Sequence, residues 1–92
     1  MTITEVLLRV IDVLADFCWL EVESIYSTDT LYDLAITEKE DYEKLEEDLE
    51  VEFTSEFEIN WDTGITVSQL AEIICERLND GDPNQFLFPF FK

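Results

Sequence analysis

Residues 38–58 read EKEDYEKLEEDLEVEFTSEFE, and these twenty-one residues hold eleven carboxylates against two lysines. The large apolar side chains of this segment recur three or four positions apart, and they are Tyr42, Leu45, Leu49 and Phe53. In a helix this spacing places them in one narrow stripe. The pattern predicts a helix that ends at about Phe53, with Thr37 as the residue that caps its start. So much like charge around one stripe indicates either a disordered segment or a surface that binds a positive partner.

Composition favours the folded alternative. The 92 residues are 47% hydrophobic and include twelve aromatic side chains, whereas disordered chains are poor in both. This length suits one small domain with one core, spanning residues 1–92. Five basic and 23 acidic residues give a net charge of −18, which opposes binding to nucleic acid or to an anionic membrane. The composition therefore favours a basic protein surface or divalent cations as the partner, with no direct nucleic acid binding and no membrane binding.

Two further helices are expected, one on each side of the acidic segment. Residues 4–17 carry apolar side chains at helical spacing, and Thr2 or Thr4 is expected to cap this helix. Residues 66–69 read TVSQ, which is a capping box. It opens a third helix that ends near Asn79. The sequence thus predicts an all-α fold with three main helices.

The two connections differ in composition. The long first loop, residues 19–37, is rich in Ser, Thr and Asp. Its apolar residues are expected to pack back on the core, and they are Leu20, Val22, Ile25, Leu31 and Leu34. In the second connection, Phe57 and Ile59 leave a short extra helix and an extended piece equally open.

Cys18 and Cys75 lie within apolar helical patterns, so they are expected to be free, buried thiols rather than a disulfide or a pair of metal ligands. The absence of histidine removes the commonest general base and metal ligand. A small helical bundle also offers little pocket in which two carboxylates could divide acid and base roles. We therefore expect no enzyme activity and no metal site. Without a leader-like start or a membrane-length apolar run, the cytoplasm is the expected compartment.

Residues 84–92 form an apolar tail that follows a Gly-Asp-Pro turn. One interpretation is that the tail folds back over the core, because large exposed apolar patches are uncommon on monomers. The alternative is a docking or self-association segment. Its side chains would be Phe86, Leu87, Phe88, Phe90 and Phe91.

Three local motifs lie in these elements: residues 27–35 read STDTLYDLA, residues 49–53 read LEVEF and residues 65–74 read ITVSQLAEII. Together with the order of the elements, these motifs resemble the acyl carrier protein family. The family has Thr-Asp-Thr-x-Leu-x-x-Leu-Gly in its long first loop, an acidic second helix and a last helix opened by Thr-Val. The match covers about residues 3–78. The resemblance implies a small acyl carrier protein-like helical bundle with a long first loop.

The attachment residue of that family does not appear in this sequence. A carrier has a serine just after the Leu-Gly, at the start of the second helix, and its hydroxyl carries phosphopantetheine. An ungapped alignment puts Glu38 in this place, whereas alignment on the helix end puts Lys39 there. Neither can form the phosphodiester. Thr37 is the nearest hydroxyl, one residue early. No phosphopantetheine cofactor is expected unless the attachment site is displaced to Thr37.

The acidic recognition helix of the family has a counterpart here. Carriers bind their enzymes through carboxylates of the second helix, which meet Arg and Lys patches. The corresponding carboxylates flank the apolar stripe and are expected to ring the exposed faces; they are Glu40, Asp41, Glu43, Glu46, Glu47, Asp48 and Glu50. A charge run of this kind is often only a solvated face. However, Glu43 with Glu47 and Glu46 with Glu50 are like-charged neighbours that destabilise a helix, which favours a binding face.

Three functions follow from these patterns. The first is a non-catalytic, carrier-like protein that docks on a basic patch of a partner through its acidic second helix, without a phosphopantetheine arm. The alternative is an acidic DNA mimic, or inhibitor of a nucleic-acid-binding enzyme, whose carboxylates imitate phosphates. A further alternative is a genuine carrier with a displaced attachment residue. The carrier-like motif order favours the first, since a mimic has no need of it.

Overall fold

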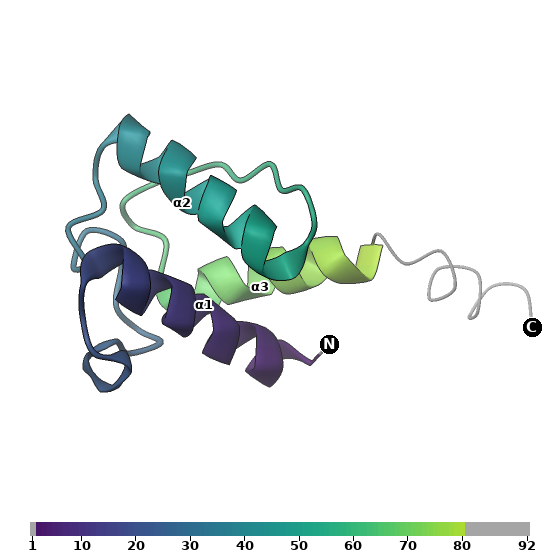
Figure 1. The fold of residues 1–92 in the computed structure, drawn as a ribbon, viewed down its shortest axis with the longest axis horizontal. Helices are drawn as coiled ribbons and strands as arrows, with labels where there is room; N and C mark the ends of the chain where they lie inside the picture. The colour runs from purple at the N-terminus through teal and green to yellow at the C-terminus, as the bar shows by residue number, and fades with distance from the viewer. Residues whose placement is uncertain (1, 81–92) are drawn as a thin grey trace, which may run out of the picture.

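A computed structural model describes residues 2–80 of the chain. In this part the helices are α1 (Ile3–Cys18), a short 3-10 turn η1 (Val22–Ser24), α2 (Lys39–Phe53) and α3 (Val67–Asp80) (Figure 1). The described residues form no strand, and their only bridge joins Thr30 to Thr66. The predicted all-α bundle of three main helices with a long first loop is confirmed. Both interpretations of the apolar tail concern residues outside the described range.

Helix α1 is one residue longer at each end than the periodicity predicts. Thr2, not Thr4, caps it in a reciprocal capping box: the backbone N–H of Glu5 donates to Thr2 Oγ1 (3.2 Å), and that of Thr2 donates to Glu5 Oε1 (3.1 Å). At the other end, Trp19 takes a left-handed conformation with φ 60°, and its N–H donates to the carbonyl of Ala15. The N–H of Leu20 bonds to the same carbonyl (2.9 Å), which closes the helix.

The capping box predicted for α3 is also confirmed. The N–H of Gln69 donates to Thr66 Oγ1, and the N–H of Thr66 donates to the side-chain oxygen of Gln69, both at 3.0 Å. Behind this cap, the buried face of α3 consists of Val67, Leu70, Ala71 and Ile74. α1 contacts both α3 and α2, and α1 and α3 run in opposite directions (Figure 1).

The long first loop packs on the core from Ile25 onward. Ile25, Leu31 and Leu34 are buried as predicted, and Ile36 is buried with them, whereas Leu20 and Val22 stay 43% exposed. Backbone hydrogen bonds tie this loop to the start of α3. The amides of Leu31 and Tyr32 donate to the carbonyls of Ile65 and Thr63, while those of Val67 and Ser68 donate to Asp29 and Ser27. The loop is therefore an integral layer of the fold.

Two sequence expectations about α2 and its exit need adjustment. The residue that caps α2 is Glu38, without a side-chain hydrogen bond, so the prediction of Thr37 as the cap is wrong. Ile36 is buried, and its amide donates to the carbonyl of Leu31. These contacts fix the chain so that Thr37 lies one residue before the cap position of α2. The connection to α3 contains no helix, and both Phe57 and Ile59 are buried along it. The short extra helix lies in the first loop instead, as η1.

Candidate protein-interaction site

Helix α2 buries the stripe that its spacing predicts. Leu45, Leu49 and Phe53 are buried, and Tyr42 packs against the core while remaining partly exposed. Because residues three and four apart share one face of a helix, the opposite face must carry the carboxylates. Glu40, Glu43, Glu47 and Asp48 are exposed there, as expected from the sequence. The only apolar side chain exposed on α2 is Val51, at 77%.

Within residues 2–80, none of the seven predicted carboxylates forms an ion pair. Within residues 2–80 the only ion pair joins Arg9 to Glu52 at 3.9 Å, between two side chains that are well exposed. Such an exposed, long pair adds little stability. No basic side chain of residues 2–80 is therefore paired with these carboxylates.

The other three predicted carboxylates are half-buried, and two of them serve the fold. Glu46 Oε2 accepts a hydrogen bond from Trp61 Nε1 (3.1 Å), and Glu50 Oε2 accepts one from the amide of Phe57 (3.0 Å). Trp61 also stacks on Tyr42, with ring centroids 5.4 Å apart. These contacts fasten the second connection along one side of α2. Of the seven predicted carboxylates, the outer face of α2 therefore keeps only the four exposed ones, which are Glu40, Glu43, Glu47 and Asp48.

The start of α2 is where a carrier would hold its serine. Glu38 is the cap residue and Lys39 is the first helical residue, and both are exposed. Thr37 is exposed as well, but it precedes the cap. Both candidate alignments thus fall on the helix N-terminus, and neither position carries a hydroxyl group.

The two cysteines are free, as predicted, but each is only half-buried. Burial raises the pKa of the Cys18 thiol above its ordinary value, and the nearby charge of Asp41 raises it further. A thiol held in its neutral form is a poor nucleophile. In residues 2–80 no three His, Cys, Asp or Glu side chains are placed to hold a metal ion together. None of the helices in that range combines the length and the apolar character needed to cross a membrane.

The sequence did not single out Trp19, which is 94% exposed beside Asp16 and the half-buried Phe17. The periodicity extends the apolar pattern of the first helix through Phe17 and Cys18 to Trp19, which hides its exposure. The signal that could have found it is a tryptophan directly after the last helical turn, where helices commonly leave the helical conformation.

Comparisons of the chain with protein-family models, with curated proteins and with solved structures give no match.

Proposed function

We propose that this protein is a non-catalytic, acyl carrier protein-like module that docks on a basic surface of a protein partner through α2. The observation that carries the proposal is a group of four exposed carboxylates on α2, Glu40, Glu43, Glu47 and Asp48, none of which is ion-paired within residues 2–80. Glu43 and Glu47 are one helical turn apart, a like-charge arrangement that costs an isolated helix a few tenths of a kcal/mol. A cationic partner turns this cost into attraction, and it steers association electrostatically.

The backbone of the first loop supports the carrier-like part of the proposal. Ala35 stands where the family motif has glycine, and its φ is 62°, in the left-handed region that favours glycine. The loop also bonds to the turn that opens α3, through pairs such as Leu31 with Ile65. The motif residues in the loop and at the start of α3 therefore lie together in space.

Absence of the phosphopantetheine arm is part of the same proposal. It is supported by Glu38 and Lys39 at the start of α2, where only a hydroxyl side chain could form the phosphodiester. Incubation with a phosphopantetheinyl transferase and coenzyme A should leave the intact mass unchanged. The variants Glu38→Ser and Lys39→Ser, tested alongside, ask whether a serine alone restores modification. A mass gain by the wild-type chain would establish a genuine carrier, and a Thr37→Val variant would then locate the site.

The docking proposal is tested by neutralising two α2 carboxylates against a matched pair on another helix. Glu43→Gln with Glu47→Gln removes two exposed charges one turn apart on α2. Glu72→Gln with Glu76→Gln removes two exposed charges with the same spacing on α3. Basic proteins that the wild type captures at low salt and releases at high salt are purified, and their Kd values are measured. The α2 pair should weaken binding about three- to tenfold, and the α3 pair should change it much less.

Two outcomes would contradict docking through α2. Equal weakening by both pairs would mean that only net charge matters, and the absence of any salt-released partner would remove the basis of the proposal. Competition with duplex DNA decides between the two kinds of partner. If duplex DNA displaces the protein from the captured partner, the DNA-mimic function replaces the carrier-like one.

A further inference from the structure

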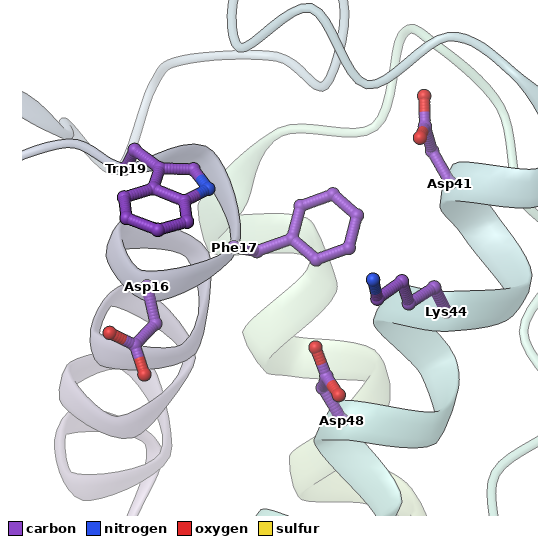
Figure 2. A pocket seen from close by; sticks show the side chains of 6 residues that line it. All are labelled: Asp16, Phe17, Trp19, Asp41, Lys44 and Asp48. Atoms are coloured by element: carbon purple, nitrogen blue, oxygen red, sulfur yellow. The ribbon is translucent and has the colours of Figure 1, made fainter.

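A groove of about 420 Å³ lies between the C-terminal end of α1 and the part of α2 from Asp41 to Asp48 (Figure 2). It is lined by Asp16, Phe17, Trp19, Asp41, Lys44 and Asp48. Figure 2 shows the Phe17 ring directed from the end of α1 toward α2, with Lys44 and Asp48 on the α2 side. The groove thus has an aromatic wall from one helix end and a charged wall from the other helix.

The aromatic wall is open to solvent. Trp19 is 94% exposed, although the half-buried Phe17 precedes it by only two residues. Leu20 and Val22, which follow, are each 43% exposed. Contiguous exposed apolar side chains rimmed by charges are typical of interaction sites. In addition, Trp19 holds a left-handed backbone conformation in which glycine would be less strained, so neither packing nor backbone preference within the monomer accounts for an indole here.

The charged side chains of the groove, which come from both helices, indicate the chemistry of the occupant. Asp16, Asp41 and Asp48 bring three carboxylates to the groove, and Lys44 brings one ammonium. No ion pair within the described part of the chain involves any of these four side chains. The groove therefore carries a net negative charge next to an exposed indole face, which itself attracts cations. A guanidinium group suits both features, because its plane stacks on an aromatic ring while its edge donates to carboxylates.

We propose that this groove binds an arginine side chain from a basic segment of a protein partner, with the guanidinium stacked on Trp19 and its charge balanced by Asp16 and Asp48. The inference rests on the proposed function, and it names the residue type that the partner presents. Asp41, Lys44 and Asp48 are spaced three and four residues apart, so they share one side of α2. This side is distinct from the positions of Glu43 and Glu47. A basic partner could thus contact the outer face of α2 while one arginine enters the groove.

The test uses two blocked synthetic peptides of alternating glycine and cationic residues, one with arginine and one with lysine. Binding to the full chain is followed by NMR at low salt, through the indole N–H signals of Trp19 and Trp61. The arginine peptide should bind more tightly than the lysine peptide and should shift the Trp19 signal. The Trp61 signal should move little, because its N–H bonds to Glu46 within the fold. Trp19→Ala should weaken arginine-peptide binding about fivefold and abolish the preference over lysine.

Matched variants separate the groove from general electrostatics. Tyr32→Ala removes a 70% exposed aromatic ring that does not line the groove, and it should leave the Kd unchanged. Lys44→Gln removes the ammonium of the groove and should tighten binding of the arginine peptide more than Lys39→Gln does. Both lysine substitutions change the net charge equally, so a difference between them reports the groove itself.

Failure of the groove can be distinguished from failure of the proposed function. If Trp19→Ala leaves the Kd unchanged while Glu43→Gln with Glu47→Gln weakens binding, the groove proposal is overturned and docking through α2 stands. If Trp19→Ala weakens binding while Glu43→Gln with Glu47→Gln leaves the Kd unchanged, the groove proposal is supported and the outer face of α2 is not part of the binding site. Absence of binding by both peptides overturns the groove proposal, whereas docking through α2 is still decided by the Kd values of the captured partner. If sedimentation shows a dimer that Trp19→Ala dissociates, the occupant is a second copy of this chain and the arginine proposal is overturned.

Discussion

Ala35 is one of three non-glycine residues with a positive φ within residues 2–80, together with Trp19 and Thr54. Its φ is 62°, and it lies between Leu34 and Ile36, whose buried side chains fix the turn on both sides. The Cβ atom costs about 1–2 kcal/mol in the left-handed region, while glycine would cost about 0.4–1 kcal/mol through the entropy of the unfolded chain. Ala35→Gly should therefore stabilise the fold by about 0.5 kcal/mol in urea unfolding. Ala71→Gly, within buried α3, is the control and should destabilise it by about 1 kcal/mol or more. Equal destabilisation by both would contradict the strain at Ala35.

Cys18 gives the stability a specific dependence on alkaline pH. Burial, followed by the charge of Asp41, raises the pKa of its thiol above the ordinary 9.0. The unfolded chain then loses this proton at lower pH than the folded protein. The stabilising contribution is complete below pH 9 and is lost as the pH rises through the higher folded pKa. Under reducing conditions, unfolding in urea at several pH values above about 8 should show a steeper loss of stability for wild type than for Cys18→Ala. Parallel curves would assign the alkaline loss to other groups.

Carboxylates of α2 bind the connection between α2 and α3, although in the sequence they cannot be told from exposed carboxylates. Glu50 accepts a hydrogen bond from the amide of Phe57, whose side chain is buried, whereas Glu47 is exposed and bonds to no group within residues 2–80. Glu50→Ala and Glu47→Ala remove the same charge and alter helix propensity equally. Glu50→Ala should nevertheless be the less stable variant by about 1–2 kcal/mol, because it leaves a part-buried amide without a partner. Urea unfolding of the two variants measures the difference. Equal stabilities would mean that water replaces Glu50 at no cost.

The same helix shows which parts of the structure were accessible from the sequence. The stripe of Leu45, Leu49 and Phe53 and the capping box at Thr66 depend on neighbours within four residues, so periodicity and cap chemistry predict them. The roles of Glu46 and Glu50 depend on partners fifteen and seven residues away, across a connection without periodicity. Carboxylates that fasten this connection and carboxylates that face solvent therefore look alike in the sequence. The groove was missed for the same reason, since it forms only where the end of α1 meets α2.

The net charge of −18 acts on the whole molecule. Most carboxylates are exposed, and the one ion pair within residues 2–80 is long, so compaction works against self-repulsion. Raising NaCl from about 0.01 M to about 1 M shortens the screening length from about 30 Å to about 3 Å. It should raise the free energy of unfolding by an amount on the order of 1 kcal/mol. Urea is the suitable denaturant, because guanidinium chloride is itself a salt.

A charge-reduced variant provides the control for this salt effect. Replacing Glu43, Glu47, Glu72 and Glu76 by Gln removes four of the charges and leaves a formal net charge of −14. Its stability should depend less steeply on NaCl than that of the wild type, since there is less repulsion to screen. If both proteins show the same slope, the salt acts through burial of apolar surface and not through charge.

Lowering the pH reduces the same charge repulsion without added salt. One local contact, between Glu5 and Thr2, changes stability in the opposite direction. Mild acidification from pH 7 toward the sequence pI of about 4.1 should stabilise the protein, because the net negative charge of the whole molecule falls. Glu5 works in the opposite sense. Its hydrogen bonds with the backbone and side chain of Thr2 lower its pKa from 4.5. The stability from that contact is present above pH 4.5 and is lost as the pH falls through the lowered folded value.

The stability of the wild type should therefore pass through a maximum between about pH 4 and 6 when thermal melts are recorded across this range at constant ionic strength. Glu5→Gln keeps a side-chain oxygen for the Thr2 amide but does not titrate, so it should lose less stability on the acid side of the maximum. A wild-type curve that falls steadily from pH 7 downward would contradict whole-molecule repulsion. A Glu5→Gln curve that follows the wild type below pH 4.5 would show that the cap of α1 is not what limits stability in acid.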